Sequence, residues 1–196
     1  MTPRKTLALI LAMGGLVACG QGLYIPAKAQ LAQVLLERSW DRARQGIETP
    51  TPWSWADTWP VARLRAPEHD EDLIVLAGAS GSVLAFGPGH LTGTTPPHLH
   101  GNIVLGGHRD THFAFLEHLE DGDELILETP AGPTRRFVIE SRQIVDHRET
   151  EALDPTEQST LTLVTCYPFH TVQVGGPLRY VVQATEKNLD KAKFNA

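Results

Sequence analysis

The chain has 196 residues, including 17 Gly and 14 Pro, and its formal net charge is -6 at pH 7. This length fits one ordinary domain with a short extension, and it is enough to bury a hydrophobic core. The negative charge and the absence of a basic run argue against nucleic acid as a partner.

The N-terminal segment predicts export. Arg4 and Lys5 precede residues 6–25, which carry no charge. About 20 apolar residues suffice to cross a bilayer as a helix, and flanking cations favour a cytoplasmic N-terminus. We favour an uncleaved signal anchor over residues 1–26, which passes once through the inner membrane and leaves the rest facing the periplasm or exterior. Two cleaved forms stay open: a signal peptide cut at the A-x-A sequence of residues 27–29, and a lipoprotein lipidated on Cys19.

Residues 27–60 predict a helix followed by a linker. Leu31, Val34 and Leu35, with Trp40, fall on one stripe of an amphipathic helix that ends near residue 44. Residues 46–60 are rich in Pro and Trp and cannot continue that helix. We expect an ordered linker that lays its tryptophans against the domain that follows.

Short β-like runs separated by turn residues fill the rest of the chain. A domain over residues 61–185 and a tail over residues 186–196 are expected. One short helix is predicted over residues 113–119, with Phe113, Phe115 and Leu116 turned inward. Eight short strands with almost no competing helix favour a closed barrel or a sandwich. The predicted strands are residues 61–64, 73–77, 83–86, 103–106, 124–128, 134–145, 160–165 and 178–184.

Cys166 is the one cysteine outside the apolar N-terminal segment, and it ends the β-rich run that starts at Thr160. A cysteine at a strand end is more often a small buried hydrophobe than a nucleophile. A nucleophilic thiol needs a basic or cationic partner. His108 follows the apolar run of residues 103–107, and Arg179 opens the last predicted strand, where its guanidinium could stabilise an oxyanion. Each of the three has an ordinary structural explanation, and the 58 residues between His108 and Cys166 do not link them.

Two other groups of residues suggest metal binding, with weaker signals. His98 and His100, and His108 and His112, have spacings that zinc ligands use, but the second pair lacks the Glu of an H-E-x-x-H motif. We expect no metal and no cofactor. A solvated surface is favoured over a calcium loop for the acidic cluster, because EF-hand spacing is absent. That cluster comprises Glu117, Glu120, Asp121, Asp123 and Glu124.

Three sequence blocks, in order along the chain, resemble the sortase family. The sequence TLVTC at residues 162–166 resembles the T-L-x-T-C signature that ends the cysteine-bearing strand of sortases. GHRDT at residues 107–111 resembles the segment with the family's histidine, and RYVV at residues 179–182 matches the position of its arginine. The resemblance covers roughly residues 60 to 185.

A narrower resemblance is to the sortases of Gram-negative bacteria, the class that includes the marine proteobacterial type. Residues 27–33, the helix ending near Trp40, and LAFGPGH at residues 84–90 are similar to that branch. Residues 95–100 depart from it, because a Pro-Gly turn would be expected in this loop, which the resemblance places beside the site.

The resemblance implies a mainly β fold, an eight-stranded closed sortase-type β-barrel preceded by an N-terminal transmembrane and amphipathic helix. It also implies a cysteine transpeptidase without a cofactor. Cys166 would form an acyl-thioester with a C-terminal LPxTG-like sorting signal, His108 would transfer protons, and Arg179 would stabilise the oxyanion and orient the peptide. Thr165 would help to hold substrate.

The implied partners are an exported protein with a sorting signal, an amine acceptor of unknown identity, and the inner membrane. Three other functions stay open from the sequence: an L,D-transpeptidase acting on peptidoglycan, a non-catalytic envelope binding module, and a zinc-dependent hydrolase. Against the first, Cys166 lies in Thr-Cys-Tyr-Pro and not in the S-x-G-C-x-R context of that family.

Overall fold

The structure is a computed structural model that describes residues 3–172 and 175–187. Within the first helix, the side chains of residues 4, 6–12, 14 and 16–26 also lie outside the described set. The predicted lipidation of Cys19 and most of the predicted C-terminal tail therefore fall outside the described residues.

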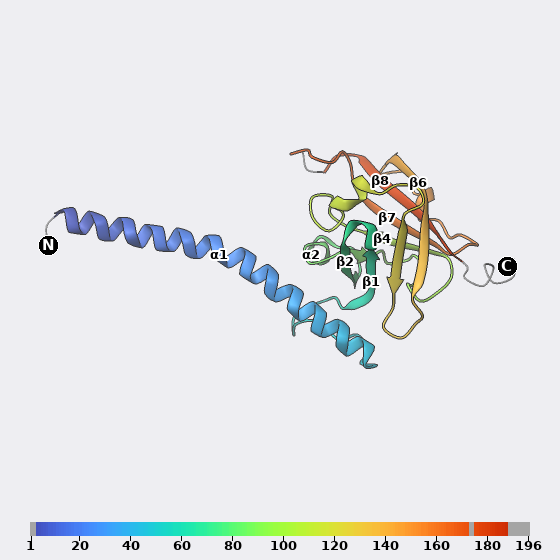
Figure 1. The fold of residues 1–196 in the computed structure, drawn as a ribbon, viewed down its shortest axis with the longest axis horizontal. Coiled ribbons are helices and arrows are strands. Elements are labelled where there is room, and N and C mark those ends of the chain that lie inside the picture. Colours follow the sequence, from blue (N-terminus) through green and yellow to red (C-terminus); the bar gives the residue numbers. More distant parts are fainter. Residues whose placement is uncertain (1–2, 173–174, 188–196) are drawn as a thin grey trace.

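Eight strands close into a barrel in the order β1-β2-β3-β4-β7-β8-β6-β5, with β5 pairing back to β1 (Figure 1). The pairs β2·β3 and β4·β7 are parallel, and the other six are antiparallel. The predicted closed barrel is confirmed. Its strands are β1 (Pro60–Ala66), β2 (Glu71–Ala77), β3 (Gly89–His90), β4 (Asn102–Gly106), β5 (Glu124–Glu128), β6 (Arg135–Asp146), β7 (Thr160–Cys166) and β8 (Leu178–Glu186).

The burial of the strands follows from their place in the barrel. In β1, residues at alternate positions are fully buried, as expected when one face turns to the core and the other is only partly covered. In β4 all five residues are buried, so this strand is covered on both faces. The main core fills the barrel with aliphatic side chains and the rings of Phe113, Phe115 and Phe137.

The helices other than the first are short. They are α2 (Gly81–Leu84) and the 3-10 helices η1 (Pro67–His69), η2 (Ala114–His118) and η3 (Glu151–Leu153). The predicted short helix appears as η2, and the three side chains expected to face inward, Phe113, Phe115 and Leu116, are buried.

One strand prediction was wrong. Residues 83–86 were expected to form a strand, but they fall in and after α2, and the eighth strand is β3. Val83 is buried, so its apolar side chain packs from a helical turn and not from a sheet. β3 begins with Gly89 because the strand runs close to the neighbouring backbone: a Cβ there would lie 2.1 Å from the carbonyl oxygen of Gly78.

The helix α1 (Pro3–Arg44) is continuous, whereas the sequence suggested two segments. Its C-terminal part packs on the barrel, and its N-terminal part extends away from it (Figure 1). The predicted apolar stripe is right in part: Trp40 is buried and Leu35 is partly buried, but Leu31 is 58% and Val34 47% exposed. Leu36, which was not on the predicted stripe, is buried beside Trp40, and the two pack with Ile74, Leu76 and Val83 in a second core outside the barrel.

The linker prediction is only partly right. Trp53 packs edge-on against Phe86 with ring centroids 4.8 Å apart, and Trp59 is half-buried, but Trp55 is 83% exposed. Two of the three linker tryptophans therefore rest on the domain, and the third points into solvent.

Among the residues that the structure describes, no helix is long and apolar enough to cross a membrane. The predicted anchor depends on residues 6–25, nearly all of whose side chains lie outside the described set. The anchor therefore stays a prediction.

The barrel has two distinct ends. At the first, which we call the Cys166 end, β4 and β7 finish and β8 begins. At the opposite end, β7 begins, β8 finishes and the loop of residues 91–101 enters β4.

Candidate active site

Cys166 and Arg179 are directly opposite each other in the antiparallel pair β7·β8. Side chains at directly opposite positions project from the same face of a sheet, with Cβ atoms about 5 Å apart. The guanidinium of Arg179 is held by the chain just before it, where Nη1 donates to the carbonyls of Gly176 and Leu178, both at 2.8 Å. Cys166 is a free cysteine and is only partly buried.

The parallel pair β4·β7 brings His108 to the same end. Each paired position is 58 residues apart, from Asn102 and Thr160 to Gly106 and Val164, and the same spacing separates His108 from Cys166. The pairing continues past the strand end, where the N–H of Gly107 donates to the carbonyl of Val164 at 3.1 Å. The spacing that had no meaning in the sequence is therefore the register of the sheet.

Thr165 fixes this junction from inside. Thr165 is only 2% exposed, and its hydroxyl donates to the carbonyl of Gly107 at 2.7 Å. The sequence assigned Thr165 a role in holding substrate, and no observation tests that role. The structure shows instead that the residue before the cysteine binds the residue before the histidine.

The turn that carries His108 is shaped by a close contact. A Cβ on Gly107 would lie 2.6 Å from Cγ of Phe113, so only glycine lets this ring pack there. The carbonyl of His108 accepts hydrogen bonds from the N–H groups of Thr111 and Phe113, at 3.3 and 3.0 Å. These contacts hold the turn while the side chain of His108 stays exposed and available to a substrate.

Within the described part of the chain, no hydrogen bond joins the thiol of Cys166 to the ring of His108. Such contacts are often long without substrate and tighten in the complex. His112 lies near the same turn, where burial lowers its pKa and the charge of His108 lowers it further.

Two residue groups at this end were not found from the sequence. Arg109 is buried, and its Nη1 and Nη2 donate to the carbonyls of Pro168 and Thr171 in the loop after Cys166. Tyr167, Phe169 and Tyr180 form a cluster of rings whose centroids lie 5.3 to 6.3 Å apart. Arginine beside the histidine was visible in the sequence, but nothing there indicated burial or these partners.

The predicted histidine pairs do not converge on one metal site. His98 and His100 precede β4 at the opposite end, whereas His108 and His112 follow it at the Cys166 end. In the described part of the chain, no three or more His, Cys, Asp or Glu side chains are grouped so that they could hold a metal ion.

The predicted acidic cluster is divided among separate basic side chains. Four of its five members each contact a different arginine or histidine, so the carboxylates do not converge on one calcium loop. The pairs are Glu117 with His170, Asp121 with Arg142, Asp123 with His69, and Glu124 with Arg136.

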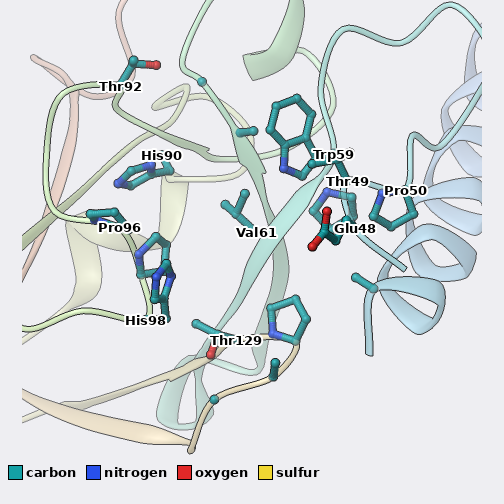
Figure 2. A pocket seen from close by; sticks show the side chains of 18 of the residues that line it. Glu48, Thr49, Pro50, Trp59, Val61, His90, Thr92, Pro96, His98 and Thr129 are labelled. Atoms are coloured by element: carbon teal, nitrogen blue, oxygen red, sulfur yellow. The ribbon is translucent and has the colours of Figure 1, made fainter. Parts of the chain in front are cut away.

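The opposite end of the barrel carries a cavity of about 990 Å³, shown in Figure 2. Its walls include Trp59, His90, Pro96 and Glu48, and none of the three candidate catalytic residues lines it. Burial lowers the pKa of His90. The loop of residues 95–100, expected beside the site, contributes to this cavity and so lies away from Cys166.

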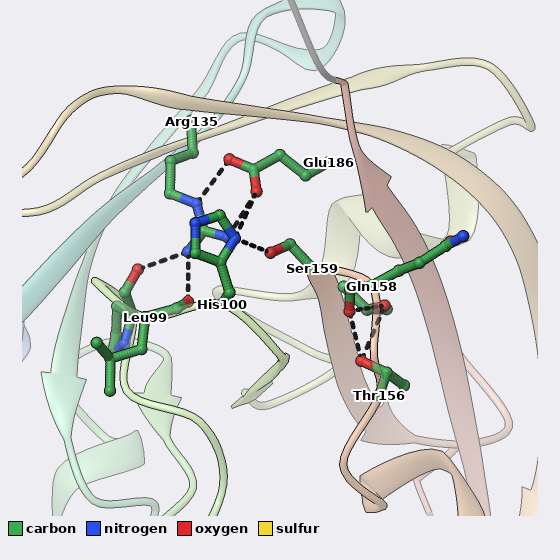
Figure 3. Close-up of polar contacts among 9 residues, drawn as sticks. Leu99, His100, Arg135, Thr156, Gln158, Ser159 and Glu186 are labelled. Carbon is green, nitrogen blue, oxygen red and sulfur yellow. Dashed lines mark hydrogen bonds and ion pairs between the residues drawn. The ribbon is translucent and has the colours of Figure 1, made fainter.

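A buried ion pair closes the same opposite end (Figure 3). Arg135 binds Glu186 through two hydrogen bonds of 2.8 Å, and it also donates to the carbonyls of Pro97 and Leu99. His100 contacts Ser159 at 2.7 Å. These contacts join the loop before β4 to the end of β8, so their role is structural.

The fold and these positions define a class: a closed β-barrel that presents a cysteine, a histidine and an arginine at one end. The family model described as the sortase domain matches residues 64–187, and the chain belongs to the sortase family.

Individual relatives agree with this assignment. The chain is 35% identical over 120 residues to sortase D of Bacillus subtilis. The matched residues make up 61% of this chain and 60% of the length of that protein. It resembles the structure of sortase C-1 from Actinomyces oris with a TM-score of 0.59 and 28% identity, covering 66% of this chain and 74% of the other. The sortase D5 transpeptidase of Clostridium perfringens shares the fold, with a TM-score of 0.66 and 20% identity over 81% of this chain and 99% of the other.

The narrower assignment to the Gram-negative branch gains nothing from these relatives. It depends on residues 27–33, the helix ending near Trp40 and residues 84–90.

Proposed function

We propose that the protein is a membrane-anchored sortase that cleaves a C-terminal sorting signal through a thioester on Cys166 and transfers the acyl group to an amine. The observation that carries the proposal is the meeting of Cys166, His108 and Arg179 at one barrel end, produced by two independent strand pairings. The 35% identity to sortase D over 120 residues supports the same class of chemistry.

The first half of the reaction forms the thioester. The thiolate of Cys166 attacks the carbonyl carbon of the scissile peptide bond, and the carbon–nitrogen bond of the tetrahedral intermediate then breaks. His108, as imidazolium, gives its proton to the leaving amine. The guanidinium of Arg179 donates to the oxyanion while it exists. Its position opposite Cys166 suits this role because the two side chains share a face.

The second half regenerates the enzyme. An incoming amine attacks the thioester carbonyl, neutral His108 accepts the proton that the amine loses, and the thiolate of Cys166 leaves. Water in place of the amine gives hydrolysis. No step requires a metal or a cofactor.

For location, we propose a single-pass anchor over residues 1–26 in the inner membrane, with the barrel on the periplasmic side. Arg4, Lys5 and the uncharged residues 6–25 support it. We also propose membership in the Gram-negative branch, on the residues that resemble it, and an exported substrate protein with an LPxTG-like signal.

The test is turnover of a peptide that contains an LPxTG-like sequence, with and without a primary amine such as triglycine. Wild type should cleave the peptide and form the amide with triglycine, while Cys166→Ala and His108→Ala should lose activity by at least about 1,000-fold. Cleavage that survives Cys166→Ala would reject the proposal. Release of D-alanine from muropeptides, without peptide cleavage, would favour the peptidoglycan alternative.

A further inference from the structure

Arg109 is a buried cation directly after His108. Its side chain is only 6% exposed, and the neighbouring Asp110, at 3.4 Å, is 66% exposed. Its Nη1 donates to the neutral carbonyl of Pro168 at 2.8 Å, and its Nη2 donates to the carbonyl of Thr171 at 3.3 Å. Burying a guanidinium costs free energy unless its donors are satisfied, so these bonds specify where the loop lies.

Hydrogen bonds join the two chain segments that carry Cys166 and His108 at two places, one before and one after these residues. Thr165 binds Gly107, and these are the residues immediately before Cys166 and His108. Arg109, the residue after His108, binds Pro168, which lies two residues after Cys166. The two segments that carry the pair are therefore fastened to each other on both sides.

We propose that Arg109 is a positioning residue for the reaction: its guanidinium holds the loop after Cys166 against the turn that carries His108. This role rests on the proposed function only for its consequence in catalysis. The fastening itself is a property of the fold.

The barrel supplies a matched control. Arg135 is also an arginine, with a side chain 7% exposed, and it also donates to two loop carbonyls, those of Pro97 and Leu99, but at the opposite end of the barrel. Removing either guanidinium disturbs a buried site. Only one of the two sites adjoins Cys166.

The experiment compares Arg109→Met, Arg109→Lys and Arg135→Met in the full chain in detergent. The first readout is the rate at which iodoacetamide alkylates Cys166 between pH 5 and 10, measured by mass spectrometry of the Cys166 peptide. The second is kcat/KM for the sorting-signal peptide. A thermal melt of each variant establishes that it is folded.

In Arg109→Met we expect alkylation of Cys166 at neutral pH to slow and kcat/KM to fall about 10- to 100-fold, the loss that a displacement near 1 Å produces. Arg109→Lys keeps a donor but not the planar two-pronged one, so both rates should fall by a smaller factor. Arg135→Met should lower the melting temperature without changing the alkylation rate.

A folded Arg109→Met with the wild-type alkylation rate and kcat/KM would overturn the proposal, and so would equal losses of both in Arg135→Met. If Arg109→Met does not fold, Arg109→Lys decides: unchanged kcat/KM would reject the positioning role. Alkylation needs no peptide, so it reports on Arg109 even if wild type cleaves no sorting signal, and the two proposals fail separately.

Discussion

Replacing Thr165 with Val tests how the two catalytic segments are joined. The change keeps the shape of the side chain but removes the hydroxyl that donates to Gly107 at 2.7 Å. Thr165 and Gly107 are both buried, so water cannot replace the lost donor. Leaving a buried carbonyl without a partner costs about 1–3 kcal/mol. For a protein of this size, about 2 kcal/mol lowers the melting temperature by about 4–8 °C.

The same strand contains a control for this variant. Thr162 is fully buried and donates one hydrogen bond of 2.7 Å, to the side chain of Asn102. Thr162→Val should therefore destabilise the fold about as much as Thr165→Val. Because Thr162 lies four residues before Cys166, only Thr165→Val should displace the turn with His108.

The assay measures the melting temperature, the alkylation rate of Cys166 at neutral pH, and kcat and KM for the peptide. We expect Thr165→Val to slow both alkylation and kcat about tenfold or more, and Thr165→Ser, which keeps the hydroxyl, to restore most of the loss. A higher KM with unchanged alkylation would refute this reasoning and would support the substrate contact that the sequence suggested. Equal losses of activity in Thr162→Val would refute it as well.

Three further predictions concern the packing around the site and the ends of the barrel. Gly107→Ala should lower kcat/KM and reduce the free energy of unfolding by about 1–3 kcal/mol, because the added Cβ would lie 2.6 Å from the ring of Phe113. A denaturation curve with an unchanged midpoint would contradict this. The hydrogen bonds from Arg135 hold the pKa of Glu186 below its ordinary value of 4.5, so the carboxylate stabilises the fold above that pH and loses this effect as the pH falls through its lower, folded-state pKa. The difference in melting temperature between wild type and Glu186→Gln should therefore be largest near pH 7 and should vanish in strong acid; a constant difference would be inconsistent with the ion pair. Trp40→Ala should cost about 3–5 kcal/mol and release the C-terminal part of α1 to proteolysis, whereas a cost below about 1 kcal/mol would show that the helix is not packed as described.

Most of the barrel was predictable because its strands contain runs of β-branched residues and are separated by turn residues. β5 was predicted with its observed bounds, and β7 to within one residue. β3 was not, because two residues that include a glycine carry no periodic pattern. Its existence depends on the close approach of Gly89 to Gly78, which is a tertiary contact.

The site divides along the same line. Cys166, His108 and Arg179 were identified through short motifs, since the chemistry restricts which residues can occupy those positions. Their proximity was not predictable from spacing, because it depends on a parallel pairing between strands that are 58 residues apart. Arg109 was overlooked for a related reason: a charged residue is usually exposed, and only the packed loop shows that this one is buried.

The central claim is that Cys166 carries the acyl group, and intact mass spectrometry of the full chain tests it most directly. After incubation with a sorting-signal peptide and rapid acid quenching, the account predicts a mass increase equal to the N-terminal part of the peptide, located on Cys166 by fragmentation and released by hydroxylamine. His108→Ala should accumulate little adduct, and Cys166→Ala none. An adduct that persists in Cys166→Ala, or one located on any other residue, would contradict the account.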